Sequence, residues 1–273
     1  MCDHCCIESV KNRMLSRRAL LGGSAALAAA ALTPTAPAQA QGISIANGKP
    51  VDLTYELYPD FPTYFGQSGF SMEPKFTYAK EKFNLNIMTI NEHTGTHIDA
   101  PLHFSENGQS VAEIPVENLV VPLSIVHIHE RAAKDPDAQV TPDDLKAWIA
   151  KHGPLPKGGC VAMHSGWGKH VATAKFRNAD SEGKMHFPGF HVEAAKMLIE
   201  DGNTVGIASD TLSLDHGISG DFATHYAWLP TGRWGIENIA NLEALPANGA
   251  TLFVGASKHR GGSGGPARII AVV

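Results

Sequence analysis

HTGTHIDAPLHF, residues 93–104, places three histidines and one aspartate within twelve positions. Gly95 and Pro101 disfavour a continuous helix through this stretch, because glycine is a poor helix former and proline breaks the helical hydrogen bonding. The stretch follows residues 85–90, an apolar run typical of a β-strand. We therefore expect an irregular loop at the end of that strand.

The spacing of the polar residues in this loop indicates a metal site. His97 and Asp99 are two positions apart, so they share one side wherever the backbone is extended. Gly95 would let the chain turn tightly enough to bring His93 beside them. Two imidazoles and a carboxylate form a ligand set suited to Zn²⁺, Mn²⁺ or Fe²⁺. The alternative is a polar loop whose histidines are only solvated.

Outside this loop, short apolar runs alternate with helical patterns. Helices are predicted after the N-cap Thr141 and over residues 191–201, which end at Gly202; weaker helical patterns cover 224–229 and 236–242. The predicted strands are rich in Val and Ile and are bounded by Gly or Pro. They cover residues 51–57, 85–90, 123–129, 160–164, 204–208, 251–254 and 267–273. This interleaving indicates an α/β layered domain.

The first forty residues have the pattern of an export signal. Arg17 and Arg18 precede residues 19–32, which are almost only Ala, Leu and Gly, and residues 38–40 form a small-residue cleavage pattern. The arginine pair resembles a bacterial twin-arginine signal. We expect a signal peptide over 1–40, a single catalytic domain over 41–273 and a periplasmic protein. An uncleaved membrane anchor is the alternative.

Charge and cysteine content narrow the class of protein. The chain carries a net charge of −5, and the leader contains four basic and two acidic residues, so the remainder is more acidic. Since nothing forms a basic stripe, we expect no nucleic-acid partner, and no membrane association after cleavage. Of the four cysteines, only Cys160 lies beyond the leader, and its apolar neighbours favour a packing role.

The residues quoted first match in full the signature H-x-G-T-H-x-D-x-P-x-H-F of the cyclase family of metal-dependent hydrolases. That family includes bacterial kynurenine formamidase and isatin hydrolase. The likeness extends to residues 210–215, 234–237 and 255–262, and so covers most of the chain beyond the leader. The resemblance implies a swivelling β/β/α domain with mixed sheet layers and few helices, assembled as a homodimer or homotetramer.

The resemblance also implies site residues. His103 corresponds to an acid/base histidine, although it could instead be a fourth metal ligand or a residue that orients one. Asp99 could bridge two ions. The implied metal ligands are His93, His97 and Asp99 for one ion, with His225 and Glu237 completing a second site.

Together, the leader, the expected site and the family resemblance imply an exported enzyme that hydrolyses an amide or lactam C–N bond. The reaction would use metal-bound hydroxide and one or two Zn²⁺ or Mn²⁺ ions. An aryl formamide or an isatin-like molecule is the expected substrate. The alternatives are a metal-dependent cyclase or dehydratase, and a non-catalytic periplasmic protein that binds a carboxylate. Residues expected to contact substrate are His164, Trp167 and Phe65.

Two other patterns indicate no catalytic role. Gly261-Gly262-Ser263-Gly264-Gly265 satisfies the nucleophile pattern G-x-S-x-G, but a strand-like run rather than a helix follows it, so we expect only a loop. His127 and His129 alternate within a predicted strand and should point to one face.

Overall fold

The computed structural model describes residues 48–273. The expected signal peptide at residues 1–40, with its arginine pair and cleavage pattern, lies outside these described residues. Within 48–273, no helix has the length and apolar character needed to cross a membrane.

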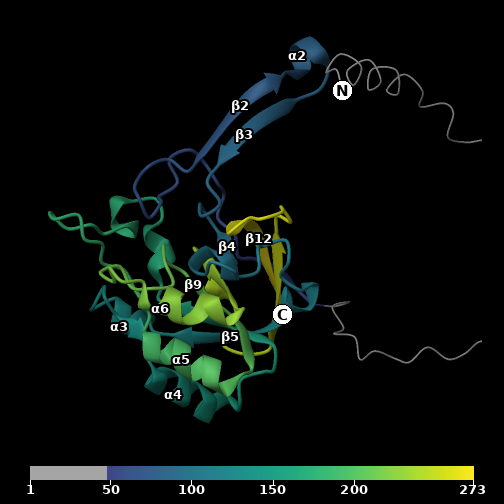
Figure 1. The fold of residues 1–273 in the computed structure, drawn as a ribbon. Coiled ribbons are helices and arrows are strands. Elements are labelled where there is room, and N and C mark those ends of the chain that lie inside the picture. Colours follow the sequence, from purple (N-terminus) through teal and green to yellow (C-terminus); the bar gives the residue numbers. More distant parts are fainter. Residues whose placement is uncertain (1–47) are drawn as a thin grey trace, which may run out of the picture. The chain divides into compact units, whose positions relative to one another are not determined.

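A mixed eight-stranded sheet forms the centre of the fold (Figure 1). The strand order is β1-β12-β11-β5-β7-β9-β10-β4, and β12 also pairs with β4, so the sheet closes on itself. The strands are β1 (Pro50–Asp52), β4 (His97–Asp99), β5 (Val120–His127), β7 (Gly159–His164), β9 (Thr204–Ser209), β10 (Trp234–Glu237), β11 (Ala250–Ala256) and β12 (Gly264–Val272). Strands β5, β7, β9 and β10 are parallel neighbours, whereas the remaining pairs are antiparallel.

The sheet buries apolar side chains on both faces, as is typical of strands that are covered on two sides. One cluster includes Ile98 of β4, Ile125 of β5 and Ile236 of β10. A second cluster joins Val161 and Met163 of β7 to the helices α4 (Pro142–His152) and α5 (Val192–Asp201). The sheet therefore presents a rigid frame on which the polar residues of β4 and β10 are fixed.

Helix α4 begins after Thr141, and α5 ends before Gly202, as the sequence predicts. The Thr141 hydroxyl accepts a hydrogen bond from the Asp144 N–H, and the Asp144 carboxylate accepts one from the Thr141 N–H, forming a capping box. At the end of α5, Gly202 adopts a left-handed φ of 72°, which only glycine reaches without steric cost. The shorter helices are α2 (Tyr78–Glu81), α3 (His129–Ala132) and α6 (Ala223–Trp228).

The expectation of mixed sheet layers with few helices is confirmed. The helix predicted at 236–242 is wrong: β10 occupies its start and the 3-10 helix η6 (Leu242–Ala244) its end. The apolar residues of this segment are spaced as in a helix, but the pairing of β10 with β9 makes its start a strand. The strand predicted at 51–57 extends only to Asp52, and the loop predicted at 93–104 contains β4 and the 3-10 helix η1 (Pro101–Phe104).

A separate hairpin consists of β2 (Phe70–Phe76) and β3 (Leu85–Ile90), with α2 at its tip (Figure 1). Its side chains include Met72, Ile87 and Met88, which are 51%, 52% and 64% exposed. An isolated two-stranded hairpin is marginally stable in water.

The remaining small elements connect the main strands and helices. A two-stranded parallel sheet joins β6 (Gln139–Val140) to β8 (Gly189–Phe190). The other 3-10 helices are η2 (Val116–Asn118), η3 (Trp167–His170), η4 (Ala174–Phe176) and η5 (Leu229–Thr231).

Candidate metal centre and active-site cavity

The register between β4 and β10 brings three ligand-type side chains together. In this antiparallel pair Glu237 lies opposite His97, and Gly235 lies opposite Asp99. His97 and Asp99 share one side of β4 because they are two residues apart. His97 Nε2 is therefore 3.4 Å from both Asp99 Oδ1 and Glu237 Oε2. All three side chains are buried.

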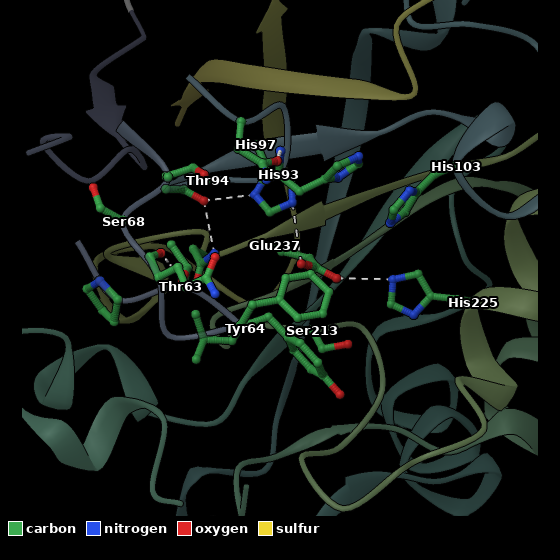
Figure 2. Close-up of a pocket in the computed structure, with 18 of the residues that line it drawn as sticks. Thr63, Tyr64, Ser68, His93, Thr94, His97, His103, Ser213, His225 and Glu237 are labelled. Atoms are coloured by element: carbon green, nitrogen blue, oxygen red, sulfur yellow. Dashed lines mark hydrogen bonds and ion pairs between the residues drawn. The ribbon is translucent and has the colours of Figure 1, made fainter. Parts of the chain in front are cut away.

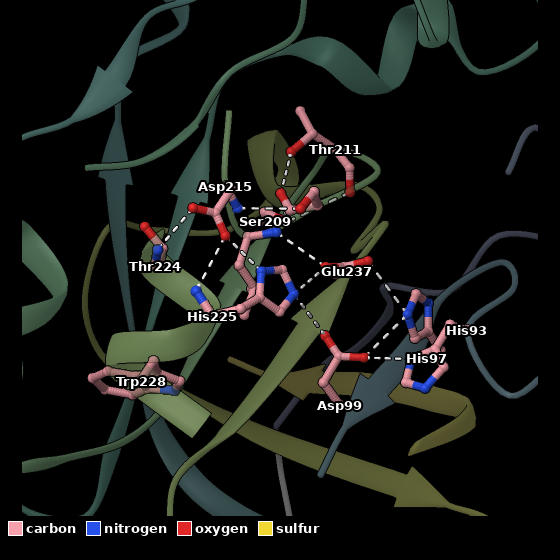
Figure 3. A network of polar contacts seen from close by, with 12 residues as sticks. His93, His97, Asp99, Ser209, Thr211, Asp215, Thr224, His225, Trp228 and Glu237 are labelled. Atoms are coloured by element: carbon pink, nitrogen blue, oxygen red, sulfur yellow. Dashed lines mark hydrogen bonds and ion pairs between the residues drawn. The ribbon is translucent and has the colours of Figure 1, made fainter. Parts of the chain in front are cut away.

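A fourth group arrives from α6. His225 Nε2 lies 3.1 Å from Glu237 Oε1 and 3.7 Å from Asp99 Oδ2. The other ring nitrogen, Nδ1, lies 2.6 Å from Asp215 Oδ2, which also accepts the backbone N–H of His225 (Figure 3). A carboxylate on the far side of a histidine fixes the orientation of its ring, an arrangement common around metal ions.

His93 occupies the other side of Asp99. Its Nδ1 is 2.7 Å from Asp99 Oδ1, its Nε2 is 2.9 Å from Ser263 Oγ, and its ring stacks on His103 with centroids 3.8 Å apart. Gly264 makes room for this ring, since a Cβ at that position would lie 2.6 Å from His93 Cε1. His93 is thus held between the aspartate and the first residues of β12.

Two buried atoms in this centre lack a hydrogen-bond partner within residues 48–273. They are His97 Nε2 and Asp99 Oδ2. Buried polar atoms are almost always paired, so orphaned atoms call for an explanation. One nitrogen and one carboxylate oxygen, directed toward Glu237 and His225, form a donor set that a divalent cation would complete. The residues present fit a metal ion.

The charges of the centre favour a cation as well. Burial disfavours the imidazolium of His97, but the Asp99 and Glu237 carboxylates outweigh burial and raise its pKa to about 10. Although burial opposes ionisation, the neighbouring histidines, His97 first, hold the pKa of Asp99 well below its ordinary value. Protons on the imidazoles thus balance buried carboxylates, and a metal ion would replace those protons on binding.

His103 lies in a different electrostatic setting. Burial lowers its pKa to about 4, and the opposing carboxylates of Asp99 and Glu237 do not reverse this. The ring is therefore neutral at neutral pH. Its position above His93 and 6.0 Å from the His225 ring, measured between centroids, puts it at the edge of the polar centre.

A cavity of about 400 Å³ opens over these residues (Figure 2). Its polar wall includes His93, His97, His103, His225 and Glu237. Its apolar wall is mainly aromatic and comprises Pro62, Tyr64, Phe65, Phe104, Leu212 and Phe222. The cavity therefore combines a charged centre with flat apolar surfaces, which suits a small planar ligand.

Of the residues expected to contact substrate, only Phe65 lines this cavity. His164 ends β7, where its ring contacts those of His127 and His129. Trp167 is buried and donates its indole N–H to the Phe176 carbonyl oxygen. The cavity lies over β4 and β10, whereas β9 separates β7 from β10, so the end of β7 does not reach it.

Sequence reasoning assigned no role to Asp215, Ser263 or Glu92. Ser263 Oγ donates to Glu92 Oε2 at 2.6 Å, and the Ser263 N–H also faces this carboxylate. β12 starts at the next residue and no helix follows, as expected, but Gly264 and Gly265 belong to that strand and the predicted loop ends at Ser263. Only the position of Asp215 within the family-like stretch 210–215 pointed to it.

Comparison with known proteins places this geometry among metal-dependent hydrolases. Residues 51–216 match the family model described as "Putative cyclase". An isatin hydrolase of Roseibium aggregatum is 34% identical over 201 residues, covering 70% of this chain and 75% of that protein. A kynurenine formamidase of Bacillus thuringiensis is 36% identical over 81 residues, covering 29% of this chain and 38% of that protein.

A solved structure extends the comparison to the whole fold. It is an isatin hydrolase bound to the product analogue thioisatinate, with a TM-score of 0.78 and 27% sequence identity. The superposition covers 100% of this chain and 99% of that chain.

Replacing Glu237 tests whether it binds metal. We expect Glu237→Gln to lower metal affinity at least about 10–100-fold, the loss seen when even an outer partner of a metal ligand is removed. The amide oxygen can still accept the Leu214 N–H, so the fold should persist. Metal content after dialysis, with circular dichroism as a fold check, measures the effect. Glu200→Gln, on the exposed side of α5, is the matched control. Unchanged metal content and turnover in Glu237→Gln would exclude Glu237 as a ligand.

Proposed function

This chain belongs to the cyclase family, and we propose that it is an exported enzyme that hydrolyses the amide or lactam C–N bond of a small aryl substrate. The observation that carries the proposal is the convergence of His97, Asp99, Glu237 and His225 beside an aromatic cavity. Two orphaned buried atoms in that centre support a divalent metal as the cofactor.

The metal-binding residues follow from the contacts of Asp99. Asp99 lies between His93 and His97 on one side and His225 on the other, so one carboxylate could serve one ion or two. The family resemblance assigns His225 and Glu237 to the second ion. When bound, a divalent ion lowers the pKa of a water molecule toward neutrality and polarises a carbonyl group. Zn²⁺ and Mn²⁺ both suit these nitrogen and oxygen donors, and elemental analysis of protein purified without added metal distinguishes them.

His103 is the proposed proton carrier. Its ring is neutral at neutral pH, so one ring nitrogen is free to accept a proton from the attacking water. The resulting imidazolium would return that proton to the leaving nitrogen as the C–N bond breaks. Its ring edge contacts Phe104, with 4.7 Å between the centroids, and the stack on His93 fixes its other side. These contacts hold the imidazole at the border between the polar centre and the aromatic wall.

The substrate class follows from the cavity walls and from the relatives. Tyr64, Phe104 and Phe222 give flat apolar surfaces, and Tyr64 and Phe222 lie 5.6 Å apart between ring centroids. A planar aromatic ring bearing an amide carbonyl would place the ring on these surfaces and the carbonyl oxygen toward the ion that Asp99 and Glu237 would hold. An isatin hydrolase binds a sulfur analogue of its ring-opened product, which supports a bicyclic lactam over an acyclic formamide.

A substrate comparison tests the activity. We expect the metal-loaded protein to open isatin or to hydrolyse an aryl formamide, and His103→Ala to lower turnover about 10²–10⁴-fold with metal content unchanged. His170→Ala, a partly exposed histidine outside the cavity, is the matched control. Failure to turn over either compound would reject the proposed chemistry. Loss of metal from His103→Ala would instead make His103 a ligand.

Export through the twin-arginine route is proposed from the leader alone. We expect cleavage near Ala40, and retention in the cytoplasm when Arg17 and Arg18 are both changed to lysine, because this route requires the paired arginines. Fractionation followed by mass spectrometry of the mature protein measures both effects, and Arg13→Lys is the control. Exported protein that still begins at Met1 would contradict the cleavage.

We also propose that the protein is a homodimer or homotetramer, in which the β2–β3 hairpin packs against another subunit. Met72, Ile87 and Met88 expose apolar surface on a two-stranded sheet, and such surfaces are typical of interaction sites. Met88→Glu should therefore lower the mass measured by light scattering after gel filtration. Lys80→Glu, an exposed charge change on α2, should leave that mass unchanged. A monomeric wild-type protein would refute the proposal.

A further inference from the structure

A second group of histidines lies outside the active-site cavity. His127 ends β5, His164 ends β7, and these two strands pair in parallel with His127 directly beside His164. His129 begins α3, two residues after His127. None of the three lines the cavity over Asp99 and Glu237. The parallel register alone therefore places two imidazoles next to each other at the ends of two neighbouring strands.

The three rings converge closely. His127 Nδ1 and His164 Nδ1 are 2.9 Å apart. The His164 ring centroid lies 5.1 Å from those of His127 and His129. One nitrogen from each of the three side chains lies within 4.8 Å of the other two. The three imidazoles are therefore close enough to be drawn around a single ion by small side-chain movements.

Local backbone geometry holds the third histidine in place. The turn after His164 passes through Gly166, whose φ of 68° favours glycine. A Cβ at Gly166 would lie 3.3 Å from His129 Cβ, so this turn packs directly on His129. His129 is thus positioned by the segment that follows His164, and not only by its own short helix.

A hydrogen bond between imidazoles explains only part of this arrangement. One neutral ring can donate its Nδ1 proton to the other, which accounts for the contact between His127 and His164. It does not account for His129, whose ring–ring contacts within residues 48–273 are with those same two histidines. The side chains of His127 and His129 are exposed, whereas His164 is buried, so a solvent ion can reach the group from outside.

We propose that His127, His129 and His164 form a second metal site, which binds Zn²⁺ through three imidazole nitrogens and leaves a fourth position to solvent. Neutral imidazole is a preferred ligand of Zn²⁺, and three histidines with an open position are a known coordination pattern for it. Two nitrogens bound at 2.0–2.1 Å in tetrahedral geometry lie about 3.3 Å apart. The observed separation of 2.9 Å needs to open by only a few tenths of an ångström.

The proposed ion would join the ends of two neighbouring strands to the start of α3. The segment that follows His164 donates backbone N–H groups of Ser165 and Gly166 to the buried carboxylate of Asp210. A bound ion would therefore also stabilise this turn. The role assigned here is structural and independent of the amide hydrolysis proposed above.

Zinc counting on the full protein tests the second site. Four proteins are equilibrated with Zn²⁺ at neutral pH: the wild type, His129→Ala, His127→Ala and the control His170→Ala. Bound zinc is measured by elemental mass spectrometry. We expect the wild type and His170→Ala to bind one zinc per chain more than either cluster variant. Zinc should also raise the melting temperature more in the wild type than in the cluster variants, because an ion that binds only the folded state stabilises it.

The outcomes separate clearly because His127 and His129 are exposed and their replacement leaves the core intact. Equal zinc binding by all four proteins would overturn the proposal and leave a hydrogen-bonded histidine pair. Loss of zinc from His170→Ala as well would overturn it too, since non-specific surface binding would then explain the difference. The ion at Asp99 is common to all four proteins and cancels in the comparison.

Discussion

Two buried carboxylates placed side by side are the constraint on which the site depends. Asp99 and Glu237 lie diagonally across the β4–β10 pair, with Glu237 opposite His97, and both carboxylates are buried. Burial raises the cost of ionising both carboxylates, and the charge of Asp99 adds to the cost for Glu237. Only positive charge between them makes this arrangement stable, whether it comes from imidazolium protons or from a metal ion. The need for that charge explains why histidines surround the pair.

The surrounding structure fixes the ligands through the backbone of neighbouring turns. The Gly95 carbonyl oxygen lies 2.8 Å from His97 Nδ1 and also accepts the Asn238 side-chain N–H. The Thr96 hydroxyl in turn donates to the Asn238 carbonyl oxygen. Asn238 follows Glu237 directly, so these hydrogen bonds tie the start of β4 to the end of β10. Such support keeps ligands in position before a metal binds, which lowers the cost of organising the site.

The spacing of residues in the sequence predicts that His97 and Asp99 converge, but it does not predict that Glu237 joins them. His97 and Asp99 alternate along an extended segment, so their convergence follows from spacing alone. Glu237 is different: residues 236–242 have a helical pattern, and pairing with β9 and β4 makes their start a strand. The register that sets Glu237 opposite His97 joins segments far apart in the chain, and no local pattern encodes it. His225 and Glu237 follow from the family resemblance. The apolar wall of the cavity comes from four separate segments, and of its residues only Phe65 was predicted.

The strand that carries the ligands is only three residues long, yet it is paired on both sides, with β10 and with β12. Strands with one free edge can detach by local opening, whereas a strand held on two sides must break both ladders to move. We therefore expect the amides of residues 97–99 to exchange with solvent deuterium only during large-scale unfolding. By the same logic, an ion held there would leave slowly, because its ligands share the lifetime of the sheet. Exchange of these amides on the timescale of loop fluctuations would contradict this view.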